Sequence, residues 1–452
     1  MSVEEVAVKD FQDALRGQVI RPGDPDYDEA RRVWNRMIEK RPSLIARCAG
    51  PPDVIRSVAF AREHDLPVAV RGGGHNIAGK SMSEGGLTID LSMMKAIRVD
   101  RAHRTAHAEA GALLGDLDRE TQAFGLATTL GVAPDTGIAG LTLGGGYGWL
   151  GGKYGLACDN LLSVEVVTAD GQLLTASATE NGDLFWAMQG AGANFGVVTS
   201  FEYQLHPVET VLGGLIIYPL AAGREVLRFY NSFAAAAPDE LTSVAALLTT
   251  PDGNPCVAVA VCDCGPLEQA EAHVKPLRTL TTPVADLIRP MPYLEMQKLL
   301  EPAFPLEHCY YWKSSLIRDL SAGAIEALLA CGAKMPTPLS SVALQQLHGA
   351  AARISASQTA FPHRYPHHNF DPTAIWTDPA DADRCIRWSR ECWEAMQPFV
   401  ERANYANDLG DEGEDRVRAG YGPNYERLVA LKNKYDPKNL FRLNQNITPT
   451  LA

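Results

Sequence analysis

A glycine-rich tract in the first third of the chain restricts its fold more than any other feature. Ten of the 28 residues from Gly125 to Gly152 are glycine. A segment with so few side chains cannot bury a hydrophobic core of its own, and glycine lets a backbone approach a flat or charged ligand closely. We therefore expect this tract to wrap around a bound group.

A second glycine-rich segment carries a reactive side chain. His75 follows Gly72, Gly73 and Gly74, directly after the apolar run Val68–Val70. A lone loop histidine usually forms only a hydrogen bond to the backbone. Here the three glycines after a buried strand favour a ligand contact, because free N–H groups of such a loop bind anions and neutral imidazole is a nucleophile near pH 7.

The third reactive feature is Cys158, which lies between Gly155 and the polar pair Asp159-Asn160. Most free cysteines are small buried apolar residues. These neighbours favour a reactive thiol instead, and Lys153 nearby would favour the thiolate. An imidazole and a thiol, each in a glycine-rich loop, together indicate a cofactor held by covalent bonds, which points to a flavin.

Two nucleotide-binding patterns compete with this interpretation. Gly74–Ser81 fits GxxxxGK[ST], which forms a phosphate site only if a helix follows. The next residues, Met82–Gly86, are poor helix formers, so a nucleotide triphosphatase is a remote alternative. Gly146–Gly151 fits GxGxxG, but no strand ends just before it, so it is weak support for a Rossmann site.

Composition narrows the classes of protein. The chain of 452 residues is long enough for two domains. Its formal net charge of −13 argues against a nucleic-acid partner, and no amphipathic basic segment points to a membrane surface. The first ten residues lack the pattern of a signal peptide, and the nine scattered cysteines are most simply free thiols, so we expect a cytoplasmic protein. The cysteines lack the spacing of a zinc site, so we expect no bound metal.

Strand and helix patterns alternate along the chain, and glycine clusters become rare after Pro207. We expect an α+β fold of two domains, the second an antiparallel sheet covered by helices. The expected boundaries are residues 1–208 for the first part of a cofactor-binding domain, 209–404 for a substrate-binding domain, and 405–452 for a return to the first domain.

Five segments make the chain similar to a known family. They are Arg71–His75, Gly137–Gly148, Tyr154–Asn160, Asn194–Val198 and Tyr435–Asn446. With them the chain resembles the FAD-linked oxidases of the berberine bridge enzyme type, within the vanillyl-alcohol oxidase superfamily and its PCMH-type FAD-binding fold. The resemblance implies FAD held bicovalently, by His75 at the 8α carbon and by Cys158 at C6.

The resemblance also implies which residues surround FAD. Besides His75 and Cys158 they are Arg71, Gly72, Gly73, Gly74, Asn76, Gly79, Gly137, Gly140, Leu141, Gly144, Gly145, Gly146, Tyr147, Gly148, Gly155, Asp159, Asn160, Gly196, Val198, Asn444 and Asn446. The glycine loops would bind the pyrophosphate through backbone N–H groups.

The expected reaction transfers hydride from an alcohol, sugar or amine carbon of a small molecule, such as a secondary metabolite, to flavin N5. Tyr421 is the leading candidate for the base, with Tyr405 and Asn407 beside the substrate. On the second domain, alternation along the strand to His348 would place Gln346 and His348 on one face toward the flavin, with Tyr310 and Trp312 from another strand.

The electron acceptor remains open. Dioxygen, reduced to hydrogen peroxide, is the default of the family, and the protein would be a monomer or homodimer. Some relatives exclude oxygen with one bulky residue near the turn that holds Ile138, so a dehydrogenase with another acceptor is the main alternative. A protein that holds FAD behind a closed pocket, without turnover, is a third.

Overall fold

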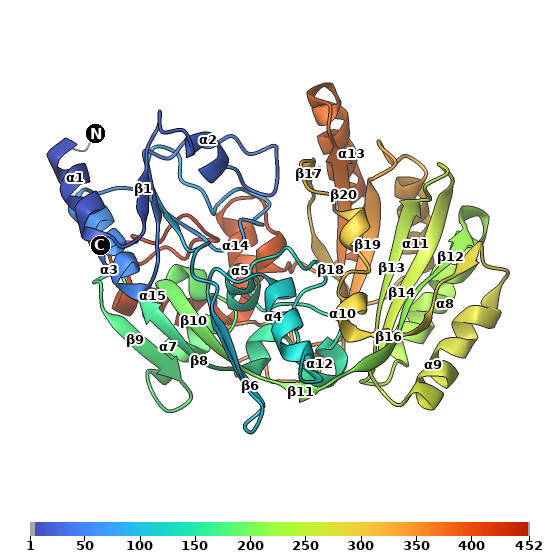
Figure 1. Cartoon of the computed structure of the whole chain (residues 1–452). Helices are drawn as coiled ribbons and strands as arrows, with labels where there is room; N and C mark the ends of the chain where they lie inside the picture. Colours follow the sequence, from blue (N-terminus) through green and yellow to red (C-terminus); the bar gives the residue numbers. More distant parts are fainter. Residues whose placement is uncertain (1–4, 451–452) are drawn as a thin grey trace.

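A computed structural model describes residues 5–450 of the chain. Two parts stand side by side in Figure 1. The first contains a four-stranded, a five-stranded and a two-stranded sheet and the two ends of the described chain, and the second contains one large sheet with its helices. The α+β fold expected from the sequence is thus confirmed, and the proposed boundary near residue 208 falls between β11 and β12.

A four-stranded sheet in the order β1-β2-β4-β3 carries the first glycine loop. Its strands are β1 (Gln18–Ile20), β2 (Leu44–Arg47), β3 (Val68–Arg71) and β4 (Leu87–Asp90), and its helices are α1 (Glu5–Ala14), α2 (Tyr27–Ala30) and α3 (Pro51–Glu63). β2 and β3 both run parallel to β4, with α3 as the crossover between them. Proline in the first turn of α3 is favourable because its missing N–H would have no partner there.

A second, antiparallel sheet follows in the order β5-β6-β10-β8-β9, and the glycine tract lies in the chain between its strands β6 and β8. The elements are β5 (Ile97–Asp100), β6 (Thr105–Glu109), α4 (Leu114–Gln122), β7 (Leu126–Ala127), α5 (Ile138–Leu143), α6 (Gly151–Tyr154), η1 (Ala157–Asn160), β8 (Leu161–Val167), β9 (Leu173–Ser177), α7 (Gly182–Met188), η2 (Gly192–Asn194), β10 (Val197–Gln204) and β11 (His206–Pro207). The β8–β9 hairpin turns at Asp170-Gly171, where Gly171 has a φ of 86°, a conformation that glycine adopts readily.

The second part is a nine-stranded antiparallel sheet in the order β15-β12-β14-β13-β19-β20-β17, with β16 beside β12 and β18 beside β20. Its strands are β12 (Thr210–Pro219), β13 (Leu241–Thr249), β14 (Pro255–Asp263), β15 (Ala285–Asp286), β16 (Arg289–Pro292), β17 (Cys309–Tyr311), β18 (Ser315–Ile317), β19 (Ser341–Leu347) and β20 (His367–Trp376).

Four long helices, α8 (Gly223–Ala235), α9 (Leu267–Leu280), α11 (Ala322–Gly332) and α13 (Ala382–Met396), pack on one face of this sheet and share a single hydrophobic core with it. In Figure 1, α8, α9 and α11 lie on the side of the sheet away from the first part. Shorter elements are η3 (Leu220–Ala222), α10 (Tyr293–Met296), η4 (Glu301–Ala303), α12 (Gly349–Arg353), η5 (Pro379–Asp381) and η6 (Gln397–Phe399). The opposite face is therefore free to form a site against the first part.

The C-terminal segment packs against the first part. It contains η7 (Ala406–Asp408), α14 (Glu414–Tyr421), η8 (Gly422–Asn424) and α15 (Tyr425–Tyr435). Lys432 on α15 is fully buried, pairs with Asp436 at 2.8 Å and donates to the carbonyl oxygens of Asn194 and Phe441. A buried lysine needs such partners, so this contact fixes the tail against the loop before β10.

No helix within residues 5–450 has the length and apolar character needed to cross a bilayer. The residues that follow Ser81 form turns and then β4, without a helix. A phosphate-binding loop requires a helix directly after it, whose N-terminus receives the phosphates. This helix is missing, so the triphosphatase alternative is wrong.

Candidate functional site

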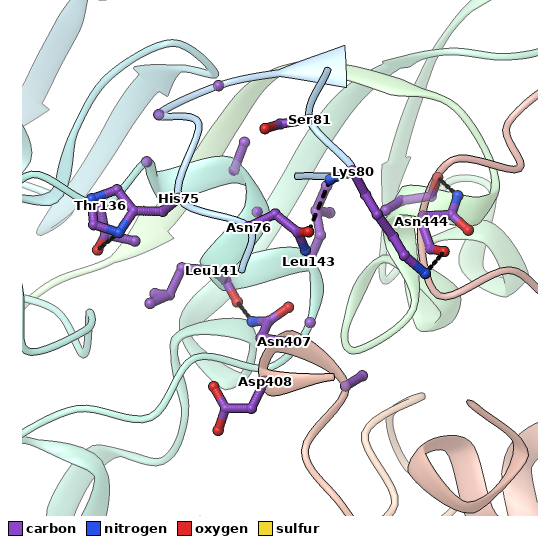
Figure 2. A pocket seen from close by; sticks show the side chains of 18 of the residues that line it. His75, Asn76, Lys80, Ser81, Thr136, Leu141, Leu143, Asn407, Asp408 and Asn444 are labelled. Carbon is purple, nitrogen blue, oxygen red and sulfur yellow. Dashed lines mark hydrogen bonds between the residues drawn. The ribbon is translucent and has the colours of Figure 1, made fainter. Parts of the chain in front are cut away.

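A cavity of about 390 Å³ lies between the two parts of the molecule. Its walls come from the loop after β3, the glycine tract, the strands β19 and β20, and the C-terminal segment (Figure 2). The predicted residues that line it are Gly72, Gly73, Gly74, His75, Asn76, Gly137, Gly140, Leu141, Gly144, Tyr147, Gly196, Val198, Asn444, Trp312, Tyr405, Asn407 and Tyr421. The structure therefore brings the loop after β3, the glycine tract, residues 190–198 and the C-terminal segment together around one space.

Glycine is required where two of these loops meet. A Cβ atom on Gly73 would lie 2.3 Å from the backbone nitrogen of Gly137, and one on Gly137 would lie 2.3 Å from that of Gly73. Real Cβ atoms do not approach a backbone so closely, so any larger residue would push the loops apart. At Gly140, in contrast, a Cβ atom would meet nothing within 4 Å, because this exposed position faces open space.

His75 lies at the wall of the cavity beside an indole ring. The Trp34 and His75 rings stack with centroids 4.6 Å apart, and Trp34 stacks in turn on Tyr310 at 3.8 Å. Nε2 of His75 lies 3.0 Å from Oδ2 of Asp135, and Nδ1 lies 3.4 Å from the hydroxyl of Thr136 (Figure 2). The stacking fixes the ring plane, and Asp135 can accept a ring proton and leave the other nitrogen free as a nucleophile.

Cys158 does not line the cavity. Its side chain is fully buried, and Sγ lies 3.6 Å from Oδ1 of Asp159 and 3.9 Å from a guanidinium nitrogen of Arg364. Burial, followed by the Asp159 carboxylate, raises the pKa of this thiol well above its ordinary value, against the effect of Arg364. Lys153, which was expected to favour the thiolate, instead lies 3.6 Å from Glu240.

Several other predicted cofactor residues support the cavity from behind rather than line it. These are Arg71, Gly79, Gly145, Gly146, Gly148, Gly155, Asp159, Asn160 and Asn446. Gly145 and Gly146 have φ values of 126° and 90°, which only glycine adopts readily, and a Cβ on Gly148 would lie 1.6 Å from a carbonyl oxygen. Arg71 donates to the carbonyl of Ala30. Tight backbone packing explains the glycines among these residues without a ligand.

The two tyrosines proposed as the base differ in their hydrogen bonds. The Tyr421 hydroxyl donates to the carbonyl of Gln445 at 3.1 Å and accepts from Asn194 at 3.2 Å, so its proton is already engaged. The Tyr405 hydroxyl accepts from the Gly146 N–H at 3.0 Å and from Asn407 at 2.8 Å. Burial raises the pKa of both tyrosines, but the two donors at Tyr405 stabilise its anion, so Tyr405 is the better candidate.

Tyr147 is the third phenol at this wall of the cavity. Its hydroxyl lies 2.8 Å from Nε2 of His367, whose Nδ1 lies 2.6 Å from the carbonyl of Tyr365. Because a carbonyl only accepts, Nδ1 must carry the proton of the neutral ring and Nε2 accepts from Tyr147. Burial lowers the pKa of His367 to about 3, which keeps the ring neutral. Tyr147 is thereby held in place and its proton is engaged.

On the second part, the structure corrects the predicted face of β19. Gln345 lines the cavity, whereas the side chain of Gln346 accepts from the backbone N–H and hydroxyl of Ser243 on the other face. His348 is buried against Gly152 and also lies outside the cavity. Trp312 lines the cavity as predicted, but Tyr310 is buried behind Trp34.

Three polar residues that sequence reasoning missed lie on the adjacent strand β20. Asn369, Asp371 and Thr373 alternate along it and all line the cavity, and the register pairs Gln345 with Asn369. Asp408, at the end of η7, lines it as well. Only the alternation of side chains between the two faces of the strand could have indicated these residues, because none of them belongs to a recognisable motif.

The far end of the cavity carries a lysine that sequence reasoning considered only as part of a triphosphatase motif. Lys80 donates to the carbonyl of Asn444 at 2.8 Å and to Oε1 of Gln445 at 3.1 Å (Figure 2). Among residues 5–450 no other lysine or arginine lines the cavity. The buried hydroxyl of Ser81 and Oδ1 of Asn444 beside it have no hydrogen-bond partner within the protein.

Comparison with known proteins identifies the scaffold. Residues 42–177 match the FAD binding domain family, and residues 403–448 match the "Berberine and berberine like" family. An FAD-linked oxidoreductase of Dictyostelium discoideum is 33% identical over 98% of this chain and 97% of its own length. The chain belongs to the FAD-linked oxidoreductases of the berberine-like type.

Further relatives agree with this family. This FAD-linked oxidoreductase is 33% identical to (R)-6-hydroxynicotine oxidase of Paenarthrobacter nicotinovorans, over 96% of the chain and 97% of that protein. The crystal structure of 6-hydroxy-D-nicotine oxidase from Arthrobacter nicotinovorans superposes with a TM-score of 0.87 at 33% identity, covering 96% of this chain and 98% of that one. The predicted two-domain, PCMH-type FAD-binding fold is therefore confirmed.

The cavity fits FAD on its own chemistry. The closely packed glycine loops expose backbone to a flat group, and Gly140 opens onto the space itself. Ser81 and Asn444 offer unpartnered polar atoms next to Lys80, the arrangement that a charged, hydroxylated ligand would satisfy. His75 lies at another part of the wall, with its ring plane fixed by Trp34.

Proposed function

We propose that this FAD-linked oxidoreductase is an oxidase that holds FAD covalently through His75 and oxidises a carbon next to oxygen or nitrogen in a small molecule. The observation that carries the proposal is the position of His75, stacked on Trp34 at the wall of a glycine-lined cavity. When bound, FAD would supply the hydride acceptor and return the electrons to dioxygen, with hydrogen peroxide as the product.

The residues at the cavity have separable roles in this proposal. Lys80 would offset the charge of the pyrophosphate, and the exposed backbone of the glycine loops would bind its oxygens. Asp135, 3.0 Å from Nε2, would accept the ring proton when His75 forms its bond. For a hydroxyl substrate, Tyr405 would accept the proton, because Gly146 and Asn407 already stabilise its anion.

A second bond from Cys158 would require the thiol to leave its buried contacts with Asp159 and Arg364. Since the sulfur is closed off from the cavity and burial keeps it protonated, we infer a single covalent bond in place of the bicovalent attachment predicted from sequence.

The position of Ile138 supports an oxidase over a dehydrogenase. Ile138 is fully buried and does not line the cavity, whereas its neighbours Ala139 and Gly140 do. The residue that was considered as an oxygen barrier therefore leaves this wall open. Consumption of dioxygen matched by peroxide formation would test this part of the proposal.

The mass of the unfolded protein tests the attachment. We expect wild type to carry one FAD after denaturation, Cys158→Ala to carry it as well, and His75→Ala to carry none. If His75→Ala retains FAD and only the double variant loses it, the bicovalent attachment is right and our single bond is wrong. If wild type neither binds FAD when folded nor carries it when unfolded, the proposed function fails.

A further inference from the structure

The cavity wall that the second part contributes is acidic. Asn369 and Asp371 face the cavity from β20, and Asp408 reaches it from η7, next to Asn407 in Figure 2. The two segments are joined by a hydrogen bond of 2.6 Å from Nδ2 of Asn369 to Oδ2 of Asp408. Two carboxylates therefore share one enclosed wall at which a small molecule could bind.

Neither carboxylate has a cationic partner. Within residues 5–450, Asp371 accepts a hydrogen bond from Thr373 at 2.8 Å, and neither Asp371 nor Asp408 forms an ion pair with lysine, arginine or histidine. The nearby cations Lys313 and Arg416 are paired with Glu412, at 2.7 and 3.2 Å. Both carboxylates are partly buried, and two such groups on one wall without a counterion repel each other, so the wall favours a ligand that brings positive charge.

An independent observation points to a ligand at the same place. Asn369 is only 2% exposed and uses its amide nitrogen on Asp408, yet its Oδ1 has no hydrogen-bond partner in the protein. The wall thus presents an orphaned amide oxygen beside two carboxylates, and all three are acceptors. Rings of Trp312, Tyr147 and Tyr405 border the same cavity, and aromatic faces also attract cations.

We propose that Asp371, Asp408 and Asn369 form a subsite for a cationic ammonium group, so that the substrate is an amine rather than a sugar or simple alcohol. The proposal rests on the oxidase function above and names its substrate class. A sugar hydroxyl could donate one hydrogen bond to this wall, but it could not offset the negative charge that the pair of carboxyl groups carries. A protonated amine offers both donors and charge.

The subsite also supplies what the oxidation of an amine requires. An ammonium nitrogen has no lone pair, so its proton must pass to a carboxylate before the neighbouring C–H bond can break. The electron pair of that bond then leaves with hydrogen as hydride to the oxidant of the proposed function, and the nitrogen lone pair forms a C=N bond. The product is an iminium cation, which the second carboxylate still stabilises.

The pKa directions agree with this proton transfer. Burial raises the pKa of Asp408 to about 6, and burial together with the Asp408 charge raises the pKa of Asp371 well above its ordinary value. A carboxyl group with a raised pKa is a stronger base toward a bound ammonium than an exposed aspartate.

Binding of small probes to the FAD-loaded enzyme tests the subsite without turnover. Under anaerobic conditions the flavin absorbance is titrated with N-methylpiperidine, which is a cation near pH 7.5, and with two neutral rings of similar size, N-formylpiperidine and cyclohexanol. We expect the cation to bind at least about tenfold more tightly than either neutral probe.

The variants Asp371→Asn and Asp408→Asn keep the side-chain shape and remove one charge each. We expect each to lower the preference for the cation at least about tenfold while leaving the affinity for neutral probes unchanged. Asp65→Asn makes the same exchange at an exposed position with positive φ, where asparagine is tolerated, and should keep the full preference.

Equal affinity for all probes, no binding of the cation, or a preference that survives both substitutions would overturn the amine subsite. A failure of the proposed oxidase function is distinguishable from this result, because the protein would then carry no FAD before any probe is added.

Discussion

At the scale of single residues, Lys80 has the best-defined electrostatic role. It is half-buried and lines the end of the cavity next to unpartnered polar atoms of Ser81 and Asn444. Burial lowers its pKa from the ordinary value against the attraction of Asp411, so the partly desolvated charge costs free energy in the empty protein. A bound diphosphate would recover that cost.

Lys80→Met should therefore weaken FAD binding. We expect about a 10- to 100-fold loss of affinity, the range for one charge-assisted hydrogen bond. The measurement is fluorescence titration of FAD into protein that also carries His75→Ala, so that binding stays reversible. Lys40→Met is the matched control, because Lys40 is also partly buried and bonds the carbonyl of Gly79 but does not line the cavity. An equal loss in both variants would contradict the prediction.

Which residues the sequence could reveal depends on their surroundings. His75 was accessible to sequence reasoning because three glycines follow a strand there, and this combination is rare without a ligand. Asp371 and Asp408 were not, since a single carboxylate in a strand or a short turn has no local signature. The polar neighbours of Cys158 in the sequence favoured a reactive thiol. In the folded protein its neighbour Asp159 instead pairs with Arg364, a residue 205 positions away.

At the scale of secondary-structure elements, β19 is the strand whose cavity-facing side chains were predicted wrongly. The strand that leads to His348 was predicted, and the structure has it at Ser341–Leu347, but the side chains facing the cavity were shifted by one position. Buried Val342 and Leu344 lie on the same face as Gln346, toward the helices, whereas Gln345 lies on the half-buried opposite face. A shift of one residue exchanges the two faces, which replaced Gln345 by Gln346.

The loop before β20 is attached to η1 by a buried ion pair. Arg364 and Asp159 have side chains 1% and 5% exposed, and two guanidinium nitrogens bond the carboxylate at 2.7 and 2.6 Å. The same guanidinium donates to Thr359 and to the carbonyl of Ala351. This contact holds the loop of Cys158 behind the cavity.

Arg364→Met should destabilise the protein by about 3–5 kcal/mol, because it leaves the Asp159 carboxylate buried without a partner. Adding Asp159→Asn should recover a large part of this loss, since the remaining charge is then removed. Urea unfolding measures both. Arg353→Met is the matched control: its ion pair with Asp239 is exposed, so we expect a change below about 1 kcal/mol. A similar loss in the Arg353 and Arg364 variants would contradict the role of the buried pair.

At the scale of the whole molecule, composition and periodicity were sufficient to predict two parts and an antiparallel sheet in the second part. The order of that sheet was not accessible, because β13 pairs with β19 almost a hundred residues later and only tertiary packing selects that partner. The cavity lies where both parts and the C-terminal segment meet, so most of its polar side chains could not be assigned before the parts were placed together.

The contact between the two parts contains a buried acid away from the cavity. Asp118 on α4 is fully buried, and its Oδ2 accepts a 2.8 Å hydrogen bond from Gln297, which directly follows α10. Its second oxygen has no partner, and neither does the hydroxyl of Tyr293. Burial raises the pKa of Asp118 to about 7, so the folded protein binds this proton much more tightly than an unfolded chain does.

The sign of the pH effect follows from the raised pKa. The stabilising effect of the bound proton is complete below the unfolded value near 4 and is lost as pH rises through about 7. Asp118→Asn removes this titration while keeping an acceptor for Gln297. We therefore expect wild type and variant to have similar free energies of unfolding near pH 4, and the variant to be more stable near pH 8 by a few kcal/mol. Urea unfolding at both pH values, with Asp65→Asn as the exposed control, measures the difference. A variant whose advantage is the same at both pH values would show that the contact between the two parts does not hold a neutral Asp118.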